Sequence, residues 1–152
     1  MKLLLDTHIL LWALTDDPRL SSTARALIFD SGNIICYSSA SLWEISIKHG
    51  LHPESVPFTA KEVDGYCRSA GYIQIPVSAS HVFALETLER AEDAPKHNAP
   101  FDRIMLSQAK AENMRFMTHD HLIPYYNEPC VEAVQPVSDA SASNAVDRTA
   151  EK

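Results

Sequence analysis

The sequence predicts an α/β fold of three layers, in which helices cover both faces of a central, mostly parallel sheet. Short apolar runs alternate along the chain with segments that have helical periodicity. Such alternation favours crossover connections, which place successive strands in one sheet and in parallel. With 152 residues, of which 45% are hydrophobic, the chain suffices for one domain with a buried core.

Five short runs are the candidate strands. The first, at residues 3–5, consists of three leucines, which is typical of a central strand buried on both faces. Two later runs follow Gly32 and Gly71 and contain aromatic and β-branched residues, which favour strands. The predicted strands are residues 3–5, 34–37, 72–75 and 115–118, and residues 130–134 are a further edge strand.

Helices are predicted between these strands. An apolar turn at residues 9–14 ends at two acids and a proline. Serine side chains are suited to cap helix starts, and a glycine is favoured just beyond a last helical turn, so Gly50 and Gly71 are expected to end two helices. The predicted helices are residues 22–29, 38–49, 59–70, 80–92 and 101–113, and residues 93–100 are a loop.

The last part of the chain differs in composition. Residues 136–152 are rich in serine, alanine and charged residues and contain almost no large apolar side chain. Such a segment cannot bury enough apolar surface to offset the entropy lost on ordering. We therefore expect one domain at residues 1–135 and a disordered tail at residues 136–152.

Composition excludes several classes of protein. No apolar stretch reaches the roughly 18 to 20 residues of a membrane span, so we expect a cytoplasmic protein without membrane association. The three cysteines are widely spaced and indicate neither a disulfide framework nor a zinc site. A net charge of −7 argues against a broad basic surface for duplex DNA, although acids that hold cations are compatible with a nuclease.

Acidic residues follow both the first and the fourth predicted strand. Asp6 comes directly after the leucine run, at the strand end where ligands bind in open α/β sheets. It is equally suited to cap a helix or a turn. Asp120 stands just beyond the run that ends at Thr118. If these two strands are neighbours, Asp6 and Asp120 meet at one edge of the sheet.

Glu44 lies on a predicted helix whose surface is largely apolar. At about 100° per residue, the apolar side chains cover roughly 200° of the circumference, so most of this helix is expected to be buried. Glu44 falls in the narrow polar remainder with Ser41 and Lys48. It either forms an exposed ion pair with Lys48 one turn on or faces an acidic crevice. The apolar positions are Leu42, Trp43, Ile45 and Ile47.

Asp102 stands in the first turn of its predicted helix, where an acid suits the helix dipole. It also shares a helix face with Met105, Leu106 and Ala109, which indicates that its side chain points inward. Burying an unpaired carboxylate costs several kcal/mol, so Asp102 is expected to have a hydrogen-bond donor, a cation or a metal ion beside it.

Together these acids suggest a metal centre. Four carboxylates at one sheet edge would raise each other's pKa unless cations were present. Mg²⁺ binds oxygen ligands and retains several waters, which leaves room for a phosphate oxygen and an attacking water. The chain has no P-loop, dinucleotide loop or ordered Ser, His and Asp set. The residues therefore favour metal-dependent hydrolysis of a phosphodiester.

The segments LLLDTHILLW, SLWEISIK, PFDRIMLSQA and THD occur in an order and at separations that resemble the PIN-domain proteins, and among them the VapC-type toxins of type II toxin–antitoxin systems. The resemblance extends from residue 1 to about residue 134. It implies an α/β/α PIN-like fold and a Mg²⁺- or Mn²⁺-dependent endoribonuclease. It further implies a homodimer, an RNA substrate, and inhibition by a cognate antitoxin protein encoded alongside.

The resemblance also implies roles for single residues. Thr7 and Thr118 flank the acidic group and would orient ligands or bind phosphate, and Arg103 is a candidate contact to RNA phosphate. Ala99 departs from the pattern, since close relatives often have an acid before the proline, and this implies weaker metal binding or loop anchoring. The acids implied to be catalytic and to form the metal site, with Glu44 helping to position the metal and the water, are Asp6, Glu44, Asp102 and Asp120.

Other interpretations compete with this one. A non-catalytic PIN-like binding or regulatory module is the main alternative, although none of the four acids is lost. An aspartyl-phosphate enzyme would ordinarily have a second acid two residues after Asp6, where His8 stands. We expect Trp12 and Trp43 to be core or dimer contacts. The histidines lack the helical spacing of zinc sites, so no ligand role is predicted for His8, His97, His119 and His121.

Overall fold

The structure is a computed structural model that describes residues 1–135, and the predicted tail lies outside the described residues. One sheet runs through the domain in the order β3-β2-β1-β4-β5, and each neighbouring pair of strands is parallel. All five predicted strands are therefore confirmed, as is the α/β class. The strands are β1 (Lys2–Leu5), β2 (Ile34–Ser38), β3 (Ile73–Ile75), β4 (Arg115–Thr118) and β5 (Val131–Ala133).

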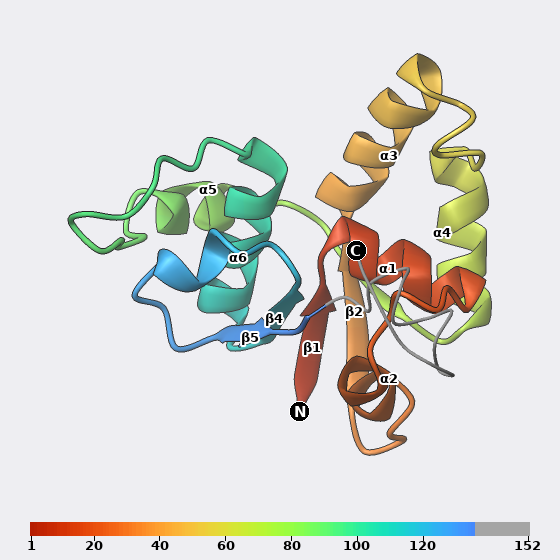
Figure 1. The fold of residues 1–152 in the computed structure, drawn as a ribbon, viewed down its shortest axis with the longest axis horizontal. Coiled ribbons are helices and arrows are strands. Elements are labelled where there is room, and N and C mark those ends of the chain that lie inside the picture. Colours follow the sequence, from red (N-terminus) through yellow and green to blue (C-terminus); the bar gives the residue numbers. More distant parts are fainter. Residues whose placement is uncertain (136–152) are drawn as a thin grey trace, which may run out of the picture.

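Helices cover both faces of the sheet, which gives the three predicted layers (Figure 1). They are α1 (Thr7–Thr15), α2 (Ser22–Ile28), α3 (Ser39–Leu51), α4 (Ala60–Ser69), α5 (Ala79–Leu85) and α6 (Pro100–Glu112), with a 3₁₀ turn η1 (Ile123–Tyr125). Successive side chains of a strand point to opposite faces. Leu3 and Leu5 accordingly belong to the core cluster under α1, α2 and α4, whereas Leu4 belongs to the cluster under α6.

The central position of β1 determines where the acids meet. It pairs with β2 on one side and with β4 on the other, and Leu5 lies opposite Met117. The N–H of Asp6 continues this ladder and donates to the carbonyl of Met117 at 3.0 Å. The chain segments that leave β1 and β4 therefore emerge side by side at the carboxyl edge of the sheet, where open α/β sheets bind ligands.

Two helices end at places that the sequence did not predict. Helix α3 continues through Gly50 to Leu51, because the N–H of His52 still closes a helical hydrogen bond to Lys48 at 2.7 Å. Helix α5 ends at Leu85 and not near residue 92, since the following backbone pairs with the segment around Tyr126. The end of α5 thus depends on contacts with a segment that is distant in sequence, whereas α3 is extended by a local helical hydrogen bond.

The buried face of α3 is also different from the predicted one. Trp43 and Ile47 are 65% and 41% exposed, whereas Ser41 and Glu44 are buried. The physical reason is that Thr7 hydrogen-bonds both polar side chains, at 2.9 Å to Ser41 and 2.6 Å to Glu44. A polar group with a partner can be buried at little cost. The helical wheel was therefore wrong for Trp43 and Ile47, whereas Ile45 is fully buried as predicted.

Other expectations about the core are confirmed. Met105, Leu106 and Ala109 lie on the inner face of α6 and are fully buried, and Trp12 is buried as well. The three cysteines are free thiols. No helix within residues 1–135 has both the length and the apolar character needed to cross a membrane.

Candidate active site

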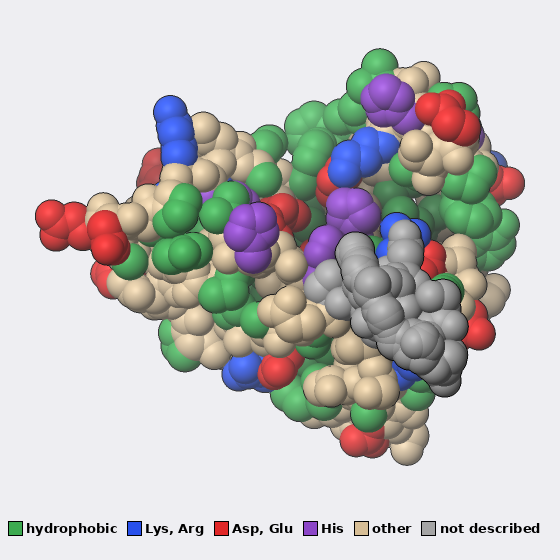
Figure 2. Space-filling model, viewed as in Figure 1, with side chains coloured by type: hydrophobic (Ala, Val, Ile, Leu, Met, Phe, Trp, Pro, Cys, Tyr) green, Lys and Arg blue, Asp and Glu red, His purple; other side chains and the backbone are tan. Residues whose placement is uncertain are grey.

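A cavity of about 320 Å³ at the carboxyl edge of the sheet is lined by all four predicted acids. Asp6 follows β1 directly and Asp120 lies two residues beyond β4. Glu44 comes from α3, and Asp102 from the first turn of α6. Figure 2 shows acidic and histidine side chains gathered in the hollow between these parts of the molecule. The remaining lining residues are His8, Lys48, Ala99, His119 and His121.

Asp6 is both a helix cap and a member of the acidic group. Its Oδ1 accepts from the N–H of Ile9 at 2.8 Å and caps α1, and its Oδ2 accepts from the Thr118 hydroxyl at 2.6 Å. Thr118 Oγ1 in turn accepts from the N–H of Asp120 at 3.0 Å, so this threonine links the two acids. Complete burial raises the pKa of Asp6 in spite of these hydrogen bonds.

Glu44 is fixed from two sides. The Thr7 hydroxyl donates to Oε1 and Lys48 Nζ lies against Oε2, each at 2.6 Å. The ion pair expected from the sequence therefore exists. It does not lie on an open surface, since Glu44 is only 8% exposed and faces the cavity. Glu44 therefore faces the acidic crevice, and its pair with Lys48 is formed there and not in the exposed setting that the first interpretation required.

Among the four acids, Asp102 has a strongly raised pKa because it is buried among clustered carboxylates. Burial, followed by the proximity of Asp120, Asp6 and Glu44, raises its pKa to about 8. Burial acts in the same direction on Asp120, but the hydrogen bonds that it accepts, the one from the Leu122 N–H first, lower the pKa of Asp120 below its usual value. The protein alone thus favours a proton on Asp102, which indicates an excess of negative charge that a cation would relieve.

The comparisons with known proteins agree with this geometry. A family model described as the PIN domain matches residues 3–127. The chain belongs to the PIN domain family. The matched residues include all four acids, the whole of β2, β3 and β4, and β1 from residue 3 onward. No curated protein matches the chain.

Solved structures share the fold of this PIN domain. One is a chain in the crystal structure of VapBC2 from Rickettsia felis bound to a DNA fragment from its promoter. That chain is 18% identical to this one, with a TM-score of 0.62, and the match covers 90% of this chain and 99% of that chain. Another belongs to a toxin–antitoxin complex from Klebsiella pneumoniae, at 17% identity and a TM-score of 0.53, with 86% and 95% covered. At these identities the likeness shows the fold.

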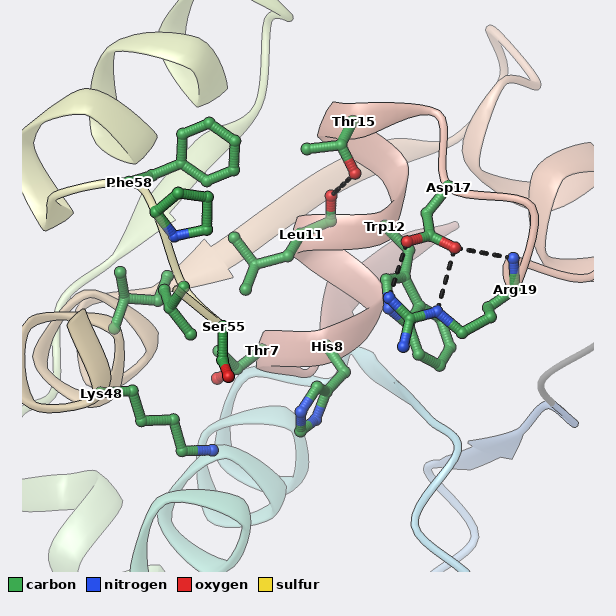
Figure 3. Close-up of a pocket in the computed structure, with 13 residues that line it drawn as sticks. Thr7, His8, Leu11, Trp12, Thr15, Asp17, Arg19, Lys48, Ser55 and Phe58 are labelled. Carbon is green, nitrogen blue, oxygen red and sulfur yellow. Dashed lines mark hydrogen bonds and ion pairs between the residues drawn. The ribbon is translucent and has the colours of Figure 1, made fainter. Parts of the chain in front are cut away.

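A second cavity, of about 420 Å³, adjoins the acidic one in this PIN domain. The two share His8 and Lys48 in their linings, and Figure 3 shows both side chains pointing into the space between α1 and α3. Leu11 and Phe58 give the second cavity an apolar wall, and the ring of Trp12 packs beneath the Arg19 guanidinium at 5.1 Å. Together the cavities form a cleft with one acidic part and one part that combines this apolar wall with polar and charged side chains.

His97 is the site residue that sequence reasoning missed. It precedes α6, is 6% exposed, and its Nε2 lies 3.2 Å from Asp120 Oδ2. Among the described residues, potential ligand atoms of His97, Asp102 and Asp120 lie within 4.8 Å of one another. Helical spacing rules could not detect it, because it lies on a loop; the only sequence signal is its place five residues before Asp102. Arg103 packs beside this group, and its Nε donates to the Tyr126 hydroxyl.

Proposed function

We propose that this PIN domain is a Mg²⁺- or Mn²⁺-dependent endoribonuclease and acts as the toxin of a toxin–antitoxin pair. The observation that carries the proposal is the convergence of four carboxylates from four separate elements on one cavity. The toxin role is supported by the shared fold with the Rickettsia and Klebsiella structures, which are of a VapBC2 complex and a toxin–antitoxin complex. A cytoplasmic location belongs to the same proposal.

The donor set suits a hard divalent cation. Carboxylate oxygens are the ligands that Mg²⁺ and Mn²⁺ prefer, and the raised pKa of Asp102 reflects the excess negative charge. When bound, the cation would lower the pKa of a water and stabilise charge on a phosphate. The residues that would hold it are Asp6, Asp102 and Asp120, with Glu44 helping to position it and the attacking water.

The neighbouring side chains have supporting roles in this proposal. Thr118 and Thr7 hold the carboxylates of Asp6 and Glu44 in place through their hydroxyl groups. Lys48 lies at the boundary of the two cavities, where its ammonium group can approach a phosphate oxygen of RNA. The chain therefore supplies both the acids for a metal ion and a cation for the substrate.

The deciding experiment is an RNA cleavage assay with antitoxin-free protein. A mixed pool of structured RNA is incubated with Mg²⁺, Mn²⁺ or chelator, and Asp6→Asn and Asp102→Asn are compared with wild type. Glu54→Gln is the matched control, because the side chain of Glu54 is 75% exposed. We expect cleavage that needs metal, is lost in both aspartate variants and is retained in the control. An uncut pool, with folded wild type that binds no metal, would favour the non-catalytic binding module.

The antitoxin is proposed to occupy the cleft. Its wall of Leu11 and Phe58 suits the apolar face of an amphipathic helix, and its acidic part suits an inserted Arg or Lys. Co-expression with the product of the neighbouring gene should give a complex that co-purifies and is inactive on RNA. Separate elution of two folded proteins would contradict this partner.

We further propose that the protein is a homodimer. Trp43 and Val82 are 65% and 45% exposed and line an apolar groove of about 500 Å³ between α3, α5 and α6. The ring centroids of Trp43 and Phe101, which also lines the groove, lie 5.1 Å apart in an edge-to-face arrangement. An apolar surface of this kind is typical of a protein–protein contact, and a second copy of the chain is the proposed occupant.

A further inference from the structure

A chain of hydrogen bonds leads from α6 into the acidic cavity. Arg103 Nε lies 3.2 Å from the Tyr126 hydroxyl, and that hydroxyl lies 3.0 Å from Nδ1 of His97. Nε2 of His97 then lies 3.2 Å from Oδ2 of Asp120. Three side chains that are separated in sequence thus form one continuous path to a carboxylate of the proposed active site.

The chemistry of the groups assigns a direction to this path. Arg103 Nε is only a donor, so the Tyr126 oxygen accepts from it. The hydroxyl hydrogen of Tyr126 is then available for Nδ1 of His97, which acts as the acceptor. The other imidazole nitrogen, Nε2, consequently carries a hydrogen and donates to Asp120. In this assignment every donor hydrogen along the path has an acceptor.

The surroundings leave the path little freedom. His97 and Tyr126 are 6% and 3% exposed, and their rings pack edge to face at 5.6 Å. The second oxygen of Asp120 accepts from the backbone N–H of Leu122 at 2.9 Å. Asp120 is therefore held at both oxygens, at one by the backbone and at the other by His97. Removing His97 would leave its orientation set by one contact.

We propose that His97 is a positioning residue of the metal centre, oriented by Tyr126 and Arg103 so that its Nε2–H holds the carboxylate of Asp120. This inference rests on the proposed metal-dependent function. Side chains that hydrogen-bond a ligating carboxylate fix its orientation, and their loss commonly weakens metal affinity or activity by roughly 10 to 100-fold. The path also assigns a role to His97 in the loop before α6.

A role as metal ligand is the competing interpretation, because the cluster of His97, Asp102 and Asp120 is compact enough to hold an ion. A ligating nitrogen must present a lone pair, whereas the assigned Nε2 carries a hydrogen. The two roles also differ in metal preference. An imidazole ligand favours Zn²⁺ or Ni²⁺ over Mg²⁺, while a positioning histidine affects all cations bound by Asp120 in the same way.

The test is calorimetric titration of antitoxin-free protein with Mn²⁺, Mg²⁺ and Zn²⁺. Tyr126→Phe removes only the hydroxyl group and should weaken Mn²⁺ and Mg²⁺ binding equally, by roughly tenfold. His97→Ala should weaken both by roughly 10 to 100-fold, and His97→Gln should recover part of the loss because its amide N–H can donate to Asp120. Tyr125→Phe is the matched control, since Tyr125 is 43% exposed, and should bind metal like wild type.

Each result has a distinct meaning. Wild type that binds no divalent metal overturns the proposed function together with this inference. Wild type that binds metal, with Tyr126→Phe and His97→Ala unchanged, overturns the positioning role and leaves the nuclease standing. A selective loss of Zn²⁺ in His97→Ala, with Mg²⁺ affinity retained, makes His97 a ligand and also overturns it.

Discussion

At the residue scale, the four acids of the candidate site differ in their surroundings within residues 1–135. Asp6, Glu44 and Asp120 each accept hydrogen bonds from hydroxyl, amide, imidazole or ammonium groups. For Asp102, burial, followed by the proximity of Asp120, Asp6 and Glu44, raises the pKa to about 8. Without a cation, this residue should therefore destabilise the folded domain whenever it is ionised.

The first prediction follows from that pKa. In the unfolded chain Asp102 ionises at its ordinary pKa of about 4, whereas in the folded state its ionisation is unfavourable. The folded state therefore begins to lose stability when the pH rises above about 4. This loss increases with pH and levels off above about 8. Asp102→Asn removes the charge, and metal-free Asp102→Asn should exceed wild type in stability by at least about 1.4 kcal/mol at pH 8, the equivalent of one pKa unit.

Thermal unfolding in chelator across this pH range is the measurement. The difference between the two proteins should be small at pH 4 and increase toward pH 8. Added Mn²⁺ should then raise the melting temperature of wild type and not that of the variant, because only a protein that binds the ion is stabilised by it. A difference that does not vary with pH would contradict the assigned pKa.

At the element scale, the start of α6 determines where Asp102 points. Ala99 occupies the N-cap position with φ −68° and ψ 104°, and Pro100 is the first helical residue. The side chain of Ala99 has no oxygen and therefore caps none of the free N–H groups of this first turn. Ala99 also lines the acidic cavity. The same position therefore affects both helix stability and the charge of the site.

Substitutions at Ala99 should separate these two effects. Ala99→Asn introduces a neutral cap and should raise the free energy of unfolding by roughly 0.5 to 1 kcal/mol. Ala99→Asp should add a carboxylate to the cavity and tighten Mn²⁺ binding, which the neutral cap should not do. Chemical denaturation and calorimetry measure the two quantities. Equal Mn²⁺ affinity in both variants would show that the missing acid has no part in metal binding.

At the scale of the whole molecule, the sheet order creates the cleft. Because β1 and β4 are neighbours, the chain segments after Leu5 and Thr118 meet, and α3 and α6 rise on either side of them (Figure 1). The same arrangement turns Trp43 and Ile47 of α3 away from the core, so that Trp43 is exposed beside Phe101. One arrangement of helices thus produces both the acidic cavity and the proposed dimer surface.

The dimer proposal predicts a change in mass. Trp43→Glu places a charge in the apolar groove and should convert a dimer into a monomer, which light scattering after gel filtration would detect. Phe29→Glu is the matched control, because Phe29 is 62% exposed at the end of α2 and outside the groove. A wild-type protein that elutes as a monomer would refute the proposed homodimer.

The strands and most helices could be predicted from local sequence. The leucine run before Asp6 and the run that ends at Thr118 predicted β1 and β4, because a buried strand needs continuous apolar residues. The end of α5 could not be predicted, since it depends on pairing with the backbone near Tyr126, which is distant in sequence. The prediction for the exposed face of α3 was wrong for a similar reason, because Thr7, the partner that allows Glu44 to be buried, is distant in sequence.

By itself the sequence determined the order of the elements, the sheet class and the four acids expected at its edge, because periodicity and strand ends are local properties. Only the tertiary structure decided that the acids share one cavity, that Asp102 has a raised pKa, and that His97 joins them through Tyr126. Burial, charge proximity and hydrogen-bond direction depend on distances across the fold. No pattern along one chain encodes those distances.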